Sequence, residues 1–109
     1  MKHFLPVILA ALLLLGVNVR AEEGKMLFDS LRCGICHKVD TGKSTPSLKE
    51  IARSYKEKEN QLLDYLEGKA EPIINPERGG TMKRYIEKTR GLKEDERKAL
   101  SGFILSHGD

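Results

Sequence analysis

The sequence predicts an all-α fold with about four short helices in a single small domain. Apolar residues recur three and four positions apart in four separate stretches, which is the spacing of one helix face. No stretch alternates apolar and polar residues as a half-buried strand does, so we expect no sheet. With 109 residues, the chain has room for one domain.

The expected helices are bounded by residues that typically begin or end a helix. Pro46 suits the start of the second helix, and Gly68 suits the end of the third. Acidic residues crowd the first turn of the last helix, where negative charge meets the positive end of the helix dipole. In chain order, we expect helices over residues 22–32, 47–56, 61–67 and 93–106.

A long connection joins the third helix to the last. It contains Pro72, Asn75-Pro76 and Gly79-Gly80, so we predict an irregular loop between Gly68 and Leu92. Within this loop, residues 82–89 have room for one or two helical turns.

Residues 1–21 are predicted to be a signal peptide, which leaves residues 22–109 as the domain. The stretch 4–17 is almost entirely apolar, and it is shorter than the roughly 20 residues that cross a bilayer. Val19 and Ala21 provide the small-residue spacing of a cleavage site. An uncleaved membrane anchor is the alternative. We therefore expect the protein in the periplasm or at the outer face of the cytoplasmic membrane.

The charges of the domain are balanced. Residues 22–109 carry 17 Lys and Arg against 16 Asp and Glu, because Lys2 and Arg20 lie in the first 21 residues. A nucleic-acid binder would need a basic excess to neutralise phosphates, so we expect no nucleic-acid partner. A domain of this size buries little surface on its own and often needs a cofactor or a covalent staple.

The only two cysteines of the chain lie in Cys33-Gly34-Ile35-Cys36-His37, which matches the attachment signal of c-type haem. Two thiols three positions apart on a helical turn can reach both vinyl groups of one porphyrin edge. The adjacent histidine can then bind the iron. We therefore predict one haem c per chain, covalently bound through Cys33 and Cys36, with His37 as an axial ligand.

Other sites for a cysteine pair fit the sequence less well. A zinc site needs two further ligands, and His3 and His107 are poorly placed to supply them. A thioredoxin-like redox pair needs a βαβ context, which the sequence lacks. A structural disulfide would leave His37 unexplained.

The haem iron also needs a second axial ligand or an open position. Met26 precedes Cys33 by only seven residues, too few to cross to the far face of the ring, and His107 is at the C-terminal end. Met82 follows His37 by 45 residues and lies in the glycine-rich connection, which can wrap round the ring. We predict Met82 as the sixth ligand of the iron.

These residues resemble the small class I bacterial cytochromes c, and the likeness covers essentially the whole of residues 22–109. Gly24 and Phe28 precede the Cys-x-x-Cys-His motif as in the family's first helix, and Phe103 stands where the last helix usually has an aromatic residue. The resemblance implies the class I cytochrome c fold, in which the helices wrap round one haem and the N- and C-terminal helices cross.

The resemblance extends to the segment after the haem motif. Thr45-Pro46-Ser47-Leu48 resembles the family's Gly-Pro-x-Leu, in which the proline carbonyl accepts a hydrogen bond from the proximal histidine ring. Carried over, this implies that Pro46 fixes the tautomer and orientation of His37. The interval between His37 and Met82 is also of the usual size.

Three features depart from the family's pattern. Lys83 follows Met82 where the family often has proline, and Lys93 stands where the last helix commonly begins with Ser or Thr. The chain has no tryptophan, so the indole that often donates to a haem propionate is missing. Tyr55, Tyr85 and several arginines are candidates for that role.

The two predicted axial ligands indicate an electron carrier and not an enzyme. With His37 and Met82 on the iron, no position remains for oxygen or peroxide. We expect a monomeric, soluble single-electron carrier of a respiratory chain that docks only transiently at membrane complexes. Its expected redox partners are a cytochrome reductase complex, a terminal oxidase or a periplasmic reductase. Two alternatives are the haem subunit of a larger sulfur- or nitrogen-oxidising enzyme and a ligand-binding haem sensor.

Basic residues flank the haem motif and the predicted methionine ligand. They could surround the exposed haem edge and attract acidic patches of partners, although Asp29 and Asp40 lie nearby. A merely solvated surface is the alternative. These cations are Arg32, Lys38, Lys43, Lys83 and Arg84.

Overall fold

The computed structural model describes residues 20–42 and 45–108, and within these ranges it contains helices and no strand. The all-α prediction is therefore confirmed. None of the helices in these ranges has the length and apolar character needed to cross a membrane. The predicted signal peptide lies outside the described residues except for its last two positions. Lys43, one of the cations expected near the haem edge, also lies outside them.

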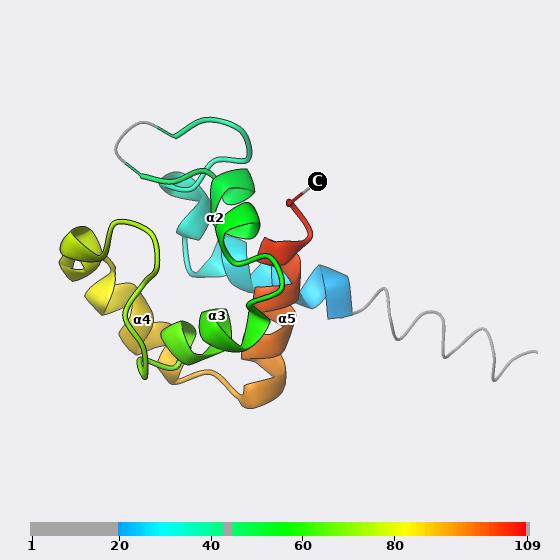
Figure 1. The fold of residues 1–109 in the computed structure, drawn as a ribbon. Coiled ribbons are helices and arrows are strands. Elements are labelled where there is room, and N and C mark those ends of the chain that lie inside the picture. Colours follow the sequence, from blue (N-terminus) through cyan, green and yellow to red (C-terminus); the bar gives the residue numbers. More distant parts are fainter. Residues whose placement is uncertain (1–19, 43–44, 109) are drawn as a thin grey trace, which may run out of the picture.

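The helices follow the predicted order, with small shifts at their ends (Figure 1). A helical segment covers residues 20–30 and is followed by a short 3-10 helix, η1. The first helix thus ends two residues before the expected Arg32. The third helix begins at Glu59, two residues before the expected residue 61. After η1 (Cys33–Ile35) come α2 (Leu48–Ser54), α3 (Glu59–Leu66), η2 (Pro76–Met82), α4 (Lys83–Arg90) and α5 (Glu94–Leu105).

The connection between α3 and α5 is irregular only up to Asn75, and the one or two helical turns that the sequence allowed within residues 82–89 are present as α4. The 3-10 helix η2 runs directly into α4. Pro76 occupies the first turn of η2, where a missing N–H has no cost. On α4, Ile86 and Thr89 lie on the face that meets α3, and this packing stabilises a helix that its sequence only weakly indicates.

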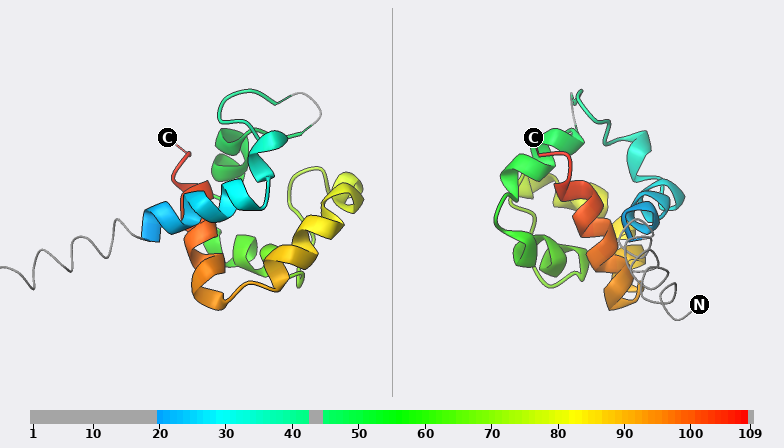
Figure 2. Two further views of the ribbon diagram at one scale, coloured as in Figure 1. Left: turned by 180° about the vertical axis from the view of Figure 1, so that it is seen from behind. Right: turned by 90° about the vertical axis from the view of Figure 1, so that its right-hand side faces the viewer.

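The helical segment 20–30 crosses α5, as the resemblance implies (Figures 1 and 2). The Phe28 and Phe103 rings pack with their centroids 5.2 Å apart. A Cβ atom on Gly24 would lie only 2.2 Å from the Ala99 carbonyl oxygen and 2.8 Å from the Phe103 Cβ. The absence of a side chain at Gly24 therefore lets the two backbones approach each other.

The hydrophobic core lies where this crossing meets α2 and α3. Its members are side chains that are almost completely shielded from solvent, and they come from segments at both ends of the chain. Leu100 is among the most deeply buried of them, with 1% of its surface exposed. The core consists of Phe28, Leu48, Tyr55, Leu62, Leu66, Leu100 and Ile104.

Two helix starts show how side chains replace missing backbone partners. Ser47 precedes α2, and its Oγ accepts a hydrogen bond from the Glu50 N–H at 3.1 Å. Lys93 precedes α5 in place of the Ser or Thr that is common in the family. There the Glu96 carboxylate accepts from the Lys93 N–H at 2.8 Å, so half of a capping box is retained.

Replacing Gly24 by alanine should destabilise the crossing. The added methyl group would overlap the Ala99 carbonyl, and overpacking of this kind costs about 1–3 kcal/mol. The free energy of unfolding, measured by chemical denaturation, should fall by that amount. Gly102→Ala is a matched control, because Gly102 is an exposed residue of α5 with open space around it and alanine should add about 1 kcal/mol of stability. A Gly24→Ala variant as stable as the original chain would show that the crossing is misassigned.

Candidate haem-binding site

A cavity of about 780 Å³ lies against the core and contains the haem motif in its wall. Every one of the helices from η1 to α5 contributes side chains to it. Most of the lining is apolar, and examples are Leu31, Ile51, Ile74, Ile86 and Leu100. A volume of this size and character is typical of a site for a bulky, largely apolar ligand.

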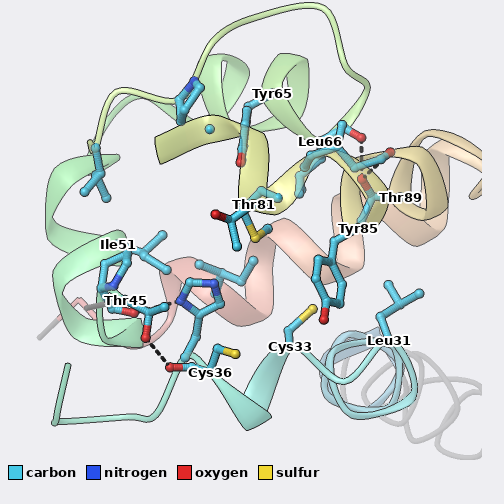
Figure 3. A pocket seen from close by; sticks show the side chains of 18 of the residues that line it. Leu31, Cys33, Cys36, Thr45, Ile51, Tyr65, Leu66, Thr81, Tyr85 and Thr89 are labelled. Atoms are coloured by element: carbon cyan, nitrogen blue, oxygen red, sulfur yellow. Dashed lines mark hydrogen bonds between the residues drawn. The ribbon is translucent and has the colours of Figure 1, made fainter. Parts of the chain in front are cut away.

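The haem motif is placed on the wall by a tight turn after the first helix. Arg32 adopts a left-handed conformation with φ of 62°, which ends that helix and starts η1. The His37 N–H donates to the Cys33 carbonyl at 2.9 Å, so the five residues of the motif form one compact turn. Figure 3 shows Cys33 and Cys36 on the same side of the pocket.

Both cysteines are free thiols, and their surroundings differ. Cys36 is exposed, whereas Cys33 is half-buried. Burial raises the pKa of the Cys33 thiol above its usual range, and the nearby negative charge of Asp29 adds to this effect. The Cys33 side chain lines the cavity.

His37 is oriented by a single backbone contact. Its Nδ1 lies 2.8 Å from the Pro46 carbonyl oxygen, the contact that the family resemblance implies. Since a carbonyl oxygen only accepts hydrogen bonds, Nδ1 donates, and in the neutral imidazole the lone pair is then on Nε2. An imidazole in this tautomer can offer Nε2 to a metal ion, and the bond to Pro46 restricts rotation of the ring.

Pro46 is itself held in place by the ends of its loop. The Thr45 hydroxyl donates to the Cys36 carbonyl at 2.7 Å (Figure 3), and the Leu48 N–H donates to the Lys38 carbonyl at 2.7 Å. These bonds close the segment between the haem motif and α2. Thr45 was not predicted as a site residue, because a threonine in a polar loop gives no sequence signal for such a contact.

Met82 is the last residue of η2, and it lines the same cavity as Cys33, Cys36 and His37. The other described methionine, Met26, has 69% of its surface exposed and lies outside the cavity wall. His107 Nδ1 lies 2.8 Å from the Phe103 carbonyl, also away from the cavity. Of the methionine and histidine side chains in the described ranges, only Met82 and His37 line the cavity.

Three tyrosines line the cavity, and one of them was not predicted. Tyr55 and Tyr85 were candidates from the sequence, and the Tyr55 hydroxyl accepts from the Ile73 N–H at 3.3 Å. Tyr65, the one missed, points into the pocket beside Thr81 in Figure 3, across from Cys33 and Cys36. Burial raises the pKa of Tyr65 to about 12, with smaller contributions from Tyr55 and Glu71. The sequence could have indicated Tyr65 as a lining residue, because it follows Leu62 by three positions and so lies on the same side of α3.

The residues present fit a haem c. The cavity offers two thiols on one wall, an imidazole with a free nitrogen and a thioether, surrounded by apolar side chains. These are the groups that hold a c-type haem by covalent and axial bonds. A zinc site fits less well, because the described residues contain no cluster of three or more His, Cys, Asp or Glu side chains.

Comparison with known families agrees with this geometry. The family model "Cytochrome c" matches residues 21–108, which is most of the chain. A comparison with individual curated proteins gave no match. Cytochromes c bind haem covalently, and the spacing of Cys33 and Cys36 is consistent with one haem in the all-helical class I fold. The chain therefore belongs to the cytochrome c family and is a haem c electron-transfer protein.

Proposed function

We propose that the protein is a soluble, exported, monomeric single-electron carrier, with His37 and Met82 as the axial ligands of its haem. One observation supports this most strongly. In the described ranges, the side chains with imidazole or thioether donors that line the cavity are these two. The haem supplies an iron ion that takes up and releases one electron.

The proposed ligands explain why the chain would carry electrons and not catalyse a reaction. If His37 and Met82 fill both axial positions, no small molecule reaches the iron. A thioether ligand and the apolar wall of the cavity both favour the ferrous state and raise the reduction potential. Members of the family are generally electron carriers.

The proposed partners are redox proteins with acidic surfaces. Arg32, Lys83 and Arg84 line the cavity, and Lys38 is exposed next to His37. Two acidic residues near this basic surface each pair with a lysine: Lys25 Nζ lies 3.1 Å from Asp29, and Lys49 Nζ lies 2.6 Å from Asp40. Glu87 also lines the cavity, so cations outnumber acidic side chains on this wall without being free of them. A cytochrome reductase complex, a terminal oxidase or a periplasmic reductase are the proposed classes of partner.

Export can be tested by intact mass. We propose that residues 1–21 are removed and that haem is attached outside the cytoplasm, in the periplasm or at the outer face of the membrane. Mass spectrometry of the protein from its native host should then give the mass of residues 22–109 plus one haem. A chain that still begins at Met1, or that has no added haem mass, would contradict this proposal.

The Met82→Ala variant tests the sixth ligand. Loss of the thioether should open the axial position, lower the reduction potential and allow carbon monoxide to bind the ferrous protein. Visible spectroscopy and potentiometry measure these changes. Met26→Ala is the matched control, because that exposed methionine lies outside the cavity and its loss should change neither property. A Met82→Ala protein with the native spectrum and potential would exclude Met82 as the ligand.

Reversing two charges at the cavity tests the docking surface. The double change Lys83→Glu with Arg84→Glu should reduce the second-order rate of electron transfer to an acidic partner about tenfold or more at low salt. The difference should diminish at high ionic strength, where charges are screened. The control is Lys56→Glu with Lys58→Glu, which changes the net charge equally but involves exposed residues outside the cavity wall. Equal rates for the two double variants would locate docking elsewhere.

A further inference from the structure

Arg97 lies on α5, but its guanidinium group bonds to the ends of two other helices. Nη1 donates to the carbonyl oxygens of Arg90 at 3.0 Å and Thr89 at 3.4 Å, and also to that of Leu92. Nη2 lies 3.1 Å from the Glu67 carboxylate, just after α3. Only 12% of the Arg97 side chain is exposed, so these bonds are partly protected from water.

The contacts of Arg97 satisfy the C-terminal end of α4. The last carbonyl groups of a helix have no partner within it, and together they form the negative end of its dipole. A cation placed among these carbonyl groups is stabilised by the negative end of the dipole. It also donates the hydrogen bonds that the carbonyl groups lack within the helix. Glu67 supplies the counter-charge, and a hydrogen bond from Lys69 lowers the pKa of its carboxyl group. The Arg97 guanidinium thus joins the ends of α3 and α4 through charged bonds.

Thr89 gives α4 a second anchor at the same end. It is 4% exposed, and its hydroxyl donates to the Leu66 carbonyl at the end of α3 with a distance of 2.6 Å. Gly68 follows that end with φ of 77°, and the turn it makes lies against Ile86 and Arg90 of α4. Two bonded side chains and one close turn therefore fix α4 to α3.

Met82 lies at the opposite end of α4, just before its first residue. This residue immediately precedes Lys83, and its own backbone is helical with φ of −87° and ψ of −8°. Ile86 and Thr89 follow Met82 at intervals of four and three, so all three lie on one face, and all three line the cavity. A helix of eight residues thus separates Met82 from the anchored end.

We propose that Arg97 and Thr89 are positioning residues for Met82: by fixing the C-terminal end of α4, they hold the thioether in the cavity. This inference rests on the proposed role of Met82 as axial ligand. One way for Met82 to leave the cavity is an outward movement of α4, the helix that it precedes. Because α4 is bonded to both α3 and α5, such a movement would break the bonds of Arg97 and the buried bond of Thr89.

Imidazole binding to the ferric protein tests this positioning role, because imidazole must displace Met82. Thr89→Val removes one anchor with little change in volume, whereas Arg97→Gln removes the other by replacing the guanidinium group with a shorter, neutral amide. Each should raise the affinity for imidazole about tenfold, the factor that corresponds to losing one such hydrogen bond. Visible absorption reports imidazole binding, and potentiometry should show a lower potential for both variants.

Two controls separate positioning from general stability. Gly24→Ala weakens the helix crossing on the other side of α5 and should leave imidazole affinity unchanged despite a lower free energy of unfolding. Lys98→Gln removes an exposed cation of α5 that pairs with Glu94 at 3.4 Å, and it should have no effect on either quantity. Arg97→Lys keeps the charge without the planar fork and should give an intermediate affinity.

The outcomes separate this inference from the proposed function. If Met82→Ala leaves the native spectrum intact, Met82 is not the ligand and the proposed function fails with it. If Met82→Ala opens the iron but Arg97→Gln and Thr89→Val bind imidazole no better than Gly24→Ala, only the positioning role is wrong. Should Arg97→Gln not accumulate as a haem-loaded protein, Thr89→Val and Arg97→Lys decide the question by the same measurement.

Discussion

The apolar cavity is the constraint on which the rest of the fold depends. Leu48, Leu62, Leu66, Leu100 and Ile104 belong to the hydrophobic core, and the same five side chains also line the cavity. The core of this small domain is thus the wall of the haem site. A haem bound there completes the packing of these side chains, so binding of the cofactor stabilises the folded chain.

The parts of the site that could be predicted from the sequence are those encoded locally. Cys33, Cys36 and His37 are adjacent, and their spacing alone specifies haem attachment. The first, second and last helices have regular apolar faces, so their positions were predicted to within two or three residues. Pro46 required the family resemblance, because nothing in the composition of its loop relates a proline carbonyl to a histidine nine residues away.

The parts that could not be predicted depend on contacts between distant segments. Thr89 bonds to Leu66 across 23 residues, and Arg97 bonds to Glu67 across 30. A threonine and an arginine on polar sequence give no sign of such partners. The sequence indicated α4 only as one or two possible helical turns within a loop. Its glycine-rich and proline-rich approach indicates irregular backbone, whereas packing against α3 makes the segment helical.

One helix supports both walls of the cavity. On one side of α5, Phe103 packs against Phe28, and Phe28 in turn contacts the turn at Gly34, where an added Cβ would lie 3.2 Å from its ring. This contact supports the cysteines and His37. Elsewhere on α5, Arg97 bonds to the C-terminal end of α4, and Met82 immediately precedes the first residue of that helix. Both sets of contacts start from the same 12-residue helix, the first near Phe103 and the second at Arg97. The haem motif and the segment that carries Met82 are thus both connected to one helix, although His37 and Met82 are 45 residues apart in the sequence.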